Sequence, residues 1–190
     1  MMITKEEFLE KEEFYAGEIN AGKVFVYPTD TIYGIGCNAT NAKAVVKIRE
    51  IKQKDEKPFS VIVPSKDWIL ENCVVSDFGR EYLDKLPGKF TLILKLKKNV
   101  NIAKKELVGE VDTIGVRMPD NWFAEFLSRH GLVFVTTSVN ISGEKPIAQV
   151  SELNEEIAGG VDYFIDDGLL DSRPSTLIDL SKEKVKIVTR

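Results

Sequence analysis

The stretch that most constrains this chain is residues 24–36, Val-Phe-Val-Tyr-Pro-Thr-Asp-Thr-Ile-Tyr-Gly-Ile-Gly. It opens with four residues of high strand propensity and breaks at Pro28, which has no N–H for a sheet ladder and fixes its own φ. A buried strand is therefore expected to end there. The loop that follows carries hydroxyls and a carboxylate, from Thr29, Asp30, Thr31 and Tyr33. Ligands of α/β proteins bind where strands end, so the loop is a candidate binding site, although its spacing fits a plain turn equally well.

Apolar periodicity predicts the remaining elements of one α/β domain over residues 1–190. Thr4 and Glu7 have the form of a capping box for an N-terminal helix that ends at Gly22. Further helices are expected at about 41–51, 66–72, 77–86, 121–129 and 151–158, and strands at 59–63, 90–96, 113–116, 132–136, 163–165, 175–180 and 184–188. The polar segment 97–110 has few order signals and fits a mobile lid. We expect an open, twisted mixed sheet of about eight strands flanked by helices.

Composition excludes several classes of protein. No apolar run approaches the ~18 residues that span a bilayer, and the first residues lack the basic-then-apolar order of a signal peptide, so we expect a cytoplasmic protein with no membrane partner. The chain has two cysteines, Cys37 and Cys73, which we expect to be free thiols. A single histidine, His130, argues against a protein metal site or a His-based triad.

Charge points to an anionic ligand. The net charge of −4 argues against a generally basic surface, but residues 42–58 hold six basic and three acidic side chains. A solvated helix face is the ordinary explanation of such a run. However, polar loops also follow three predicted strands, at 29–33, at Arg117 and at 138–140. Lysine and arginine suit phosphate or carboxylate oxygens, and no nucleophile has a base near it in sequence, which favours catalysis by positioning and electrostatics, as in nucleotidyl transfer.

Five motifs in order resemble those of the YrdC/Sua5 family, the threonylcarbamoyl-AMP synthases of tRNA modification. They are 27–36, Lys52-x-Lys54-x-x-Lys57-Pro58, Val116-Arg117-Met118-Pro119, Ser138-x-Asn140-Ile-Ser-Gly and Ser175-Thr-Leu-Ile-Asp, and the similarity extends from about residue 20 to the C-terminus. The resemblance implies an open α/β fold with a large positively charged cavity. It also implies the reaction: L-threonine, bicarbonate and ATP, with Mg²⁺ as cofactor, give threonylcarbamoyl-AMP and pyrophosphate. A downstream tRNA threonylcarbamoyl transferase complex then forms N6-threonylcarbamoyladenosine.

The resemblance also assigns roles position by position. Thr29, Arg117, Ser138 and Ser175 match residues that hold L-threonine, and Lys54, Lys57, Thr113, Asn140 and Arg190 match residues around ATP. Lys52, Lys54 and Arg117 are the expected catalytic residues, and no protein metal ligand is expected.

Three positions depart from the family pattern. Lys54 replaces the usual arginine, Ile62 stands where many members carry a histidine near threonine, and Ala148 stands where a threonine often contacts ATP. The shortened spacing to Lys57 resembles the YrdC-like domain of hydrogenase-maturation carbamoyltransferases. Two alternatives therefore stay open: a paralogue that handles another carbamoyl-adenylate, and a non-catalytic module that binds tRNA or double-stranded RNA. The enzyme hypotheses predict that Lys57→Ala or Asn140→Ala weakens ATP binding.

Overall fold

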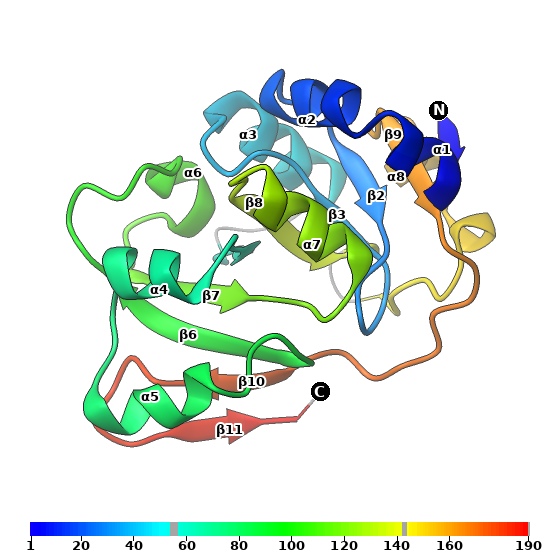
Figure 1. Ribbon diagram of the computed structural model, residues 1–190. Coiled ribbons are helices and arrows are strands. Elements are labelled where there is room, and N and C mark those ends of the chain that lie inside the picture. The colour runs from blue at the N-terminus through cyan, green and yellow to red at the C-terminus, as the bar shows by residue number, and fades with distance from the viewer. Residues whose placement is uncertain (54–56, 142–143, 190) are drawn as a thin grey trace.

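One mixed β-sheet runs through the molecule, with helices packed along it (Figure 1). The computed structural model describes residues 1–53, 57–141 and 144–189. Over these ranges the strands are β1 (Met2–Thr4), β2 (Phe25–Tyr27), β3 (Gly34–Gly36), β4 (Ser60–Ile62), β5 (Cys73–Val74), β6 (Phe90–Leu96), β7 (Thr113–Arg117), β8 (Phe134–Ser138), β9 (Tyr163–Asp166), β10 (Thr176–Asp179) and β11 (Lys186–Val188). The helices are α1 (Lys5–Glu10), α2 (Glu12–Asn20), α3 (Ala42–Ile51), α4 (Lys66–Asn72), α5 (Asp77–Leu83), α6 (Lys104–Val108), α7 (Trp122–Arg129), the 3₁₀ turn Val150–Glu152 and α8 (Glu155–Ala158).

Strand β8 joins the two halves of the sheet. The strand order is β1-β9-β2-β3-β8-β4-β7-β6-β10-β11, with β5 paired to β6. The end of β8 pairs antiparallel with β3, where Ser138 faces Gly34, and its first part pairs antiparallel with β4, where Phe134 faces Ile62. In Figure 1 the half with β2, β3 and β9 lies beside α1, α2 and α8, while the half with β6, β10 and β11 lies beside α5.

Each face of the sheet has its own hydrophobic core, because side chains alternate along a strand. Val61 and Val135 belong to the larger core. Their neighbours along the strands, Ile62 in β4 and Phe134 in β8, belong to a second core that is rich in aromatic rings. In this core Phe8 of α1 packs edge-on against Phe126 of α7, with 4.8 Å between the ring centroids. Other residues of β4 and β8, including Ser60, line a polar cavity instead.

Local signals in the sequence located most elements correctly. The Ser65 hydroxyl accepts from the Trp68 N–H and begins a helix over Lys66–Asn72 as predicted, and β6 spans Phe90–Leu96 as predicted. The Thr4 capping box is present, but the helix that it begins ends at Glu10, and α2 follows after Lys11. Gly22, with φ +86°, ends α2, since its N–H donates to Ile19 O and the next N–H donates to Glu18 O.

Three short strands, β1, β3 and β5, are absent from the prediction. The loop expected after Pro28 ends before Gly34, because β3 turns back along β2 in an antiparallel pair. Its glycines allow close packing: a Cβ on Gly36 would lie 2.0 Å from Val135 O, and one on Gly34 would lie 2.7 Å from the Tyr27 ring. Glycine-rich strands of three residues carry too little alternation to be read from sequence.

The interpretation of 97–110 as a mobile lid is wrong for α6. Leu107 is fully buried, its carbonyl accepts from Phe59 N–H at 2.9 Å, and Ala103 N–H donates to Ala39 O at 2.8 Å. The Arg49 guanidinium also donates to the Glu106 and Leu107 carbonyls in the last turn of the helix, where carbonyls lack a following helical N–H. This short helix is therefore part of the core. Within the described ranges, no helix combines the length and apolar character that crossing a membrane requires.

We predict that Leu107→Ala lowers the free energy of unfolding by about 2–5 kcal/mol, because it removes a buried side chain and leaves a cavity. The matched control, Leu70→Ala on α4, removes a leucine that is 38% exposed and should cost less than about 1 kcal/mol. Urea unfolding of both variants checks this. Equal costs would mean that α6 does not pack as described.

Candidate functional site

A polar cavity of about 320 Å³ opens between the β2–β3 turn, the strands β4, β6, β7 and β8, and two later segments. Hydroxyl groups dominate its lining. The lining residues that bear on the site are Thr29, Thr31, Tyr33, Ser60, Thr91, Arg117, Thr136, Thr137, Ser138, Asn140, Glu144 and Ser175. The structure thus brings together the four residues predicted to hold threonine, namely Thr29, Arg117, Ser138 and Ser175.

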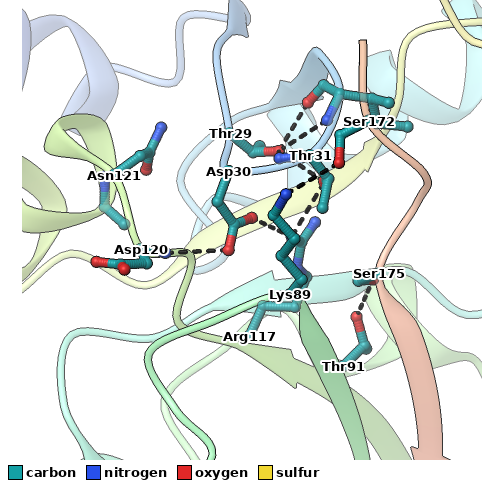
Figure 2. A network of polar contacts seen from close by, with 12 residues as sticks. Thr29, Asp30, Thr31, Lys89, Thr91, Arg117, Asp120, Asn121, Ser172 and Ser175 are labelled. Atoms are coloured by element: carbon teal, nitrogen blue, oxygen red, sulfur yellow. Dashed lines mark hydrogen bonds and ion pairs between the residues drawn. The ribbon is translucent and has the colours of Figure 1, made fainter. Parts of the chain in front are cut away.

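Arg117, the cation among the described residues that line this cavity, is paired with Asp30 (Figure 2). Nη2 of Arg117 donates to Asp30 Oδ1 at 2.8 Å and to Thr31 Oγ1 at 3.3 Å, and the two charged side chains are 8% and 5% exposed. Burial lowers the pKa of Arg117 and the Asp30 carboxylate opposes that shift, but the guanidinium still carries its proton. The Nε–H is buried and finds no hydrogen-bond partner among the described residues, so a ligand oxygen that reached it would relieve a cost of about 1–3 kcal/mol.

The Thr29 hydroxyl organises the turn that carries Asp30. It accepts from the Thr31 and Ile32 N–H groups at 3.1 and 3.2 Å and lies 2.7 Å from Ile32 O, to which it donates. Asp30 Oδ2 accepts from the Asp120 N–H at 3.1 Å, and Asn121 Nδ2 donates to Pro28 O at 2.8 Å. The turn after β2 is therefore attached to the start of α7, and Thr29 serves the turn as well as lining the cavity.

A buried pair of hydroxyls closes another side of the cavity. Thr91 Oγ1 and Ser175 Oγ lie 2.7 Å apart and join β6 to the residue before β10 (Figure 2). Sequence analysis selected Ser175 but missed Thr91. The available signal was a lone hydroxyl residue inside the otherwise apolar start of β6, at Phe-Thr-Leu-Ile-Leu.

Lys52 lies behind the cavity and not among the residues that line it in the described ranges. Its Nζ donates to Ser138 O at 2.5 Å, to Asn140 O at 2.7 Å and to Asn140 Oδ1 at 3.2 Å. Asn140 Oδ1 also accepts from Ser138 Oγ at 2.5 Å. The structure therefore brings Lys52, Ser138 and Asn140 together as one network.

The expected ATP residues are not gathered in the same way. Lys54 and Arg190 lie outside the described residues. Lys57 is exposed and its carbonyl accepts from Arg49 Nη1, whereas Thr113 begins β7, four positions before Arg117, and neither lines the cavity. Their contact with ATP stays a prediction.

Few charged side chains line the cavity in the part of the chain that the structure describes. Arg117 and Glu144 are the charged side chains among its described lining residues, so a strongly positive cavity also stays a prediction. Within residues 1–53, 57–141 and 144–189, no three His, Cys, Asp or Glu side chains gather in a way that could hold a metal ion.

Ile62 packs in the aromatic core and does not line the cavity. Both cysteines are buried free thiols, as predicted.

Comparison with known proteins identifies the family. The protein-family model Sua5_yciO_yrdC, whose description is "Telomere recombination", matches residues 18–190. The chain belongs to the Sua5/YciO/YrdC family. A similar family member is the "Putative threonylcarbamoyl-AMP synthase" of Methanocaldococcus jannaschii, 39% identical over 186 residues that cover 96% of this chain and 86% of the relative.

Solved structures of the Sua5/YciO/YrdC family share the fold. P. abyssi Sua5 complexed with L-threonine superposes with a TM-score of 0.84 at 27% identity, over 98% of this chain. This chain corresponds to only 56% of that Sua5. E. coli YciO superposes with a TM-score of 0.86 at 26% identity, over all of this chain and 94% of YciO. The mixed sheet with flanking helices that we predicted is therefore confirmed as the family fold.

We predict that Asp30→Asn lowers the free energy of unfolding by about 3–5 kcal/mol, because it leaves the buried Arg117 guanidinium without its counter-ion. Asp120→Asn is the matched control. It removes the same charge from an exposed side chain and keeps the N–H that binds Asp30, so it should change stability by no more than about 0.5 kcal/mol. Thermal and urea unfolding test both. Equal effects would show that the ion pair contributes little.

Proposed function

We propose that this protein is an L-threonylcarbamoyladenylate synthase. In this reaction the amine of L-threonine takes up bicarbonate as a carbamate and releases water. A carbamate oxygen then attacks the α-phosphorus of ATP, whose bond to the β-phosphate oxygen breaks, giving threonylcarbamoyl-AMP and pyrophosphate. The proposal includes Mg²⁺ entering with ATP and a cytoplasmic site of action. It also includes a tRNA threonylcarbamoyl transferase complex that uses the product for N6-threonylcarbamoyladenosine in tRNA.

The observation that carries this proposal is the buried Arg117 guanidinium in a cavity lined by hydroxyls. A guanidinium suits the carboxylate of an amino acid, and hydroxyls suit its amine and its own hydroxyl group. Two kinds of relative add support: the Sua5 structure complexed with L-threonine, and the relatives named threonylcarbamoyl-AMP synthase.

The cavity favours positioning chemistry over a covalent intermediate. Ser138 and Ser175 are hydrogen-bonded to Asn140 and Thr91. His130 lies beside Glu12, with Nε2 and Oε2 3.7 Å apart, at the end of α7. With no serine–histidine pair in the described residues, the chain contributes by holding the reactants in line and by neutralising phosphate charge. We assign the latter to Lys54, Lys57 and Arg190, and we propose that Asn140 and Thr113 lie beside the nucleotide.

We predict that pyrophosphate is released from Mg-ATP and bicarbonate only when L-threonine is present, with little release when serine or glycine replaces it. A coupled phosphate assay, with mass spectrometry of the adenylate, makes the measurement. ATP binding without threonine-dependent release would favour the paralogue that handles another carbamoyl-adenylate. Failure to bind ATP, together with salt-sensitive binding of tRNA or double-stranded RNA, would favour the RNA-binding module.

We predict that Arg117→Ala weakens L-threonine binding at least tenfold and changes ATP binding by less than about twofold, because a charge-assisted hydrogen bond to the carboxylate is lost. Calorimetry with each ligand alone measures both. The double variant Arg117→Ala/Asp30→Asn serves as the control, since it also removes the carboxylate that would otherwise repel threonine. Equal losses of both ligands would contradict the assignment of Arg117 to the amino acid.

A further inference from the structure

The Lys52 ammonium donates to three oxygens of the turn that follows β8. Lys52 is 3% exposed and follows the last residue of α3. An ammonium has three N–H donors, and three oxygens accept from it here: Ser138 O, Asn140 O and Asn140 Oδ1, at 2.5 to 3.2 Å. Carbonyl oxygens that converge in a buried place repel one another, and the cation between them offsets that repulsion. The turn at residues 138–140 is thus built around Lys52.

This contact fixes the orientation of the Asn140 side-chain amide. Only an oxygen can accept from an ammonium, so Oδ1 faces Lys52 and Nδ2 faces the other way. Nδ2 accordingly donates to Ile141 O at 2.9 Å and to Glu144 O at 2.8 Å. Both ends of the amide are held.

The oriented amide in turn fixes the proton of Ser138. Ser138 Oγ lies 2.5 Å from Asn140 Oδ1, which has no proton, so the serine hydroxyl must be the donor. What Ser138 Oγ offers to the cavity is then its remaining lone pairs. In this state it accepts from a ligand and does not donate to one.

We propose that Lys52 is a positioning residue that acts through Asn140 and Ser138, and that Ser138 accepts a hydrogen bond from an N–H or O–H group of the amino acid substrate. This inference rests on the proposed function and replaces the expectation that Lys52 is itself catalytic. A general base needs a lone pair within reach of the proton that it removes. The Lys52 ammonium instead donates to three oxygens of the turn behind the cavity.

A double-mutant cycle tests this relay. We expect Lys52→Met and Ser138→Ala each to raise the dissociation constant for L-threonine by about tenfold, and the double variant to be no weaker than the weaker single variant. Lys47→Met is the matched control, because Lys47 lies on the same helix but is 41% exposed and binds Asp162, so it should leave threonine binding unchanged. Additive losses would overturn the proposal. So would the disappearance of an ionisation from the pH profile of kcat in Lys52→Met, since that would make Lys52 a base.

O-methyl-L-threonine distinguishes the two possible donors. If Ser138 accepts from the substrate hydroxyl, Ser138→Ala weakens binding of L-threonine but not of its O-methyl ether. If Ser138 accepts from the amine, both ligands lose affinity equally. No loss with either ligand would overturn the acceptor role.

A measurement on the free protein separates this inference from the proposed function. In ¹⁵N NMR spectra, the Asn140 side-chain N–H signals should exchange with water at least tenfold faster in Lys52→Met than in the wild type or in Lys47→Met. Unchanged exchange would overturn the positioning role, whereas failure of the wild type to bind threonine would overturn only the proposed function and the role of Ser138 toward the substrate. If Lys52→Met does not fold, Lys52→Arg keeps the charge but replaces the compact ammonium by a planar fork, and the same non-additivity with Ser138→Ala is expected.

Discussion

The buried ion pair between Arg117 and Asp30 connects the parts of the molecule that surround the cavity. Arg117 ends β7, Asp30 lies in the turn after β2, and the second oxygen of Asp30 binds the chain just before α7. Taking two charges out of water costs several kcal/mol each, and the cost is offset only when both partners are well placed. The turn must therefore place Asp30 within hydrogen-bond distance of the guanidinium. The Thr29 hydroxyl stabilises the turn by accepting from the Thr31 and Ile32 N–H groups.

Two buried cations serve this site in different ways. Arg117 has a carboxylate partner and an Nε–H left over, so it can still take part in binding an anion. Lys52 instead donates to three neutral oxygens of the turn after β8. This difference supports our proposals that Arg117 binds the ligand and that Lys52 positions the turn behind the cavity. From the family resemblance alone, both residues are expected to be catalytic.

The family fold and the detail of its site have different origins. The sheet superposes on Sua5 and on YciO at 26–27% identity, because alternation and helix caps can be kept by many sequences. The cavity instead depends on single side chains. Ile62, at a position where a histidine would be expected in many relatives, packs into the aromatic core with Phe134 and Phe123 and leaves the polar surface to Ser60 on the same strand face.

The sequence by itself determined the α/β class, the end of β2 at Pro28, the caps at Thr4 and Ser65, and four of the residues that line the cavity, Thr29, Arg117, Ser138 and Ser175. These are local properties, set by backbone geometry and by neighbours a few residues apart. Only the tertiary structure decided what each polar group binds. Arg117 and Asp30 are 87 positions apart in the sequence, and Lys52 and Ser138 are 86 apart. Such separations follow no helical or strand period, so the sequence pattern cannot predict these contacts. Burial sets these contacts, because a charged group removed from water is costly unless it is paired or hydrogen-bonded, and the fold decides which groups lie close enough to do so.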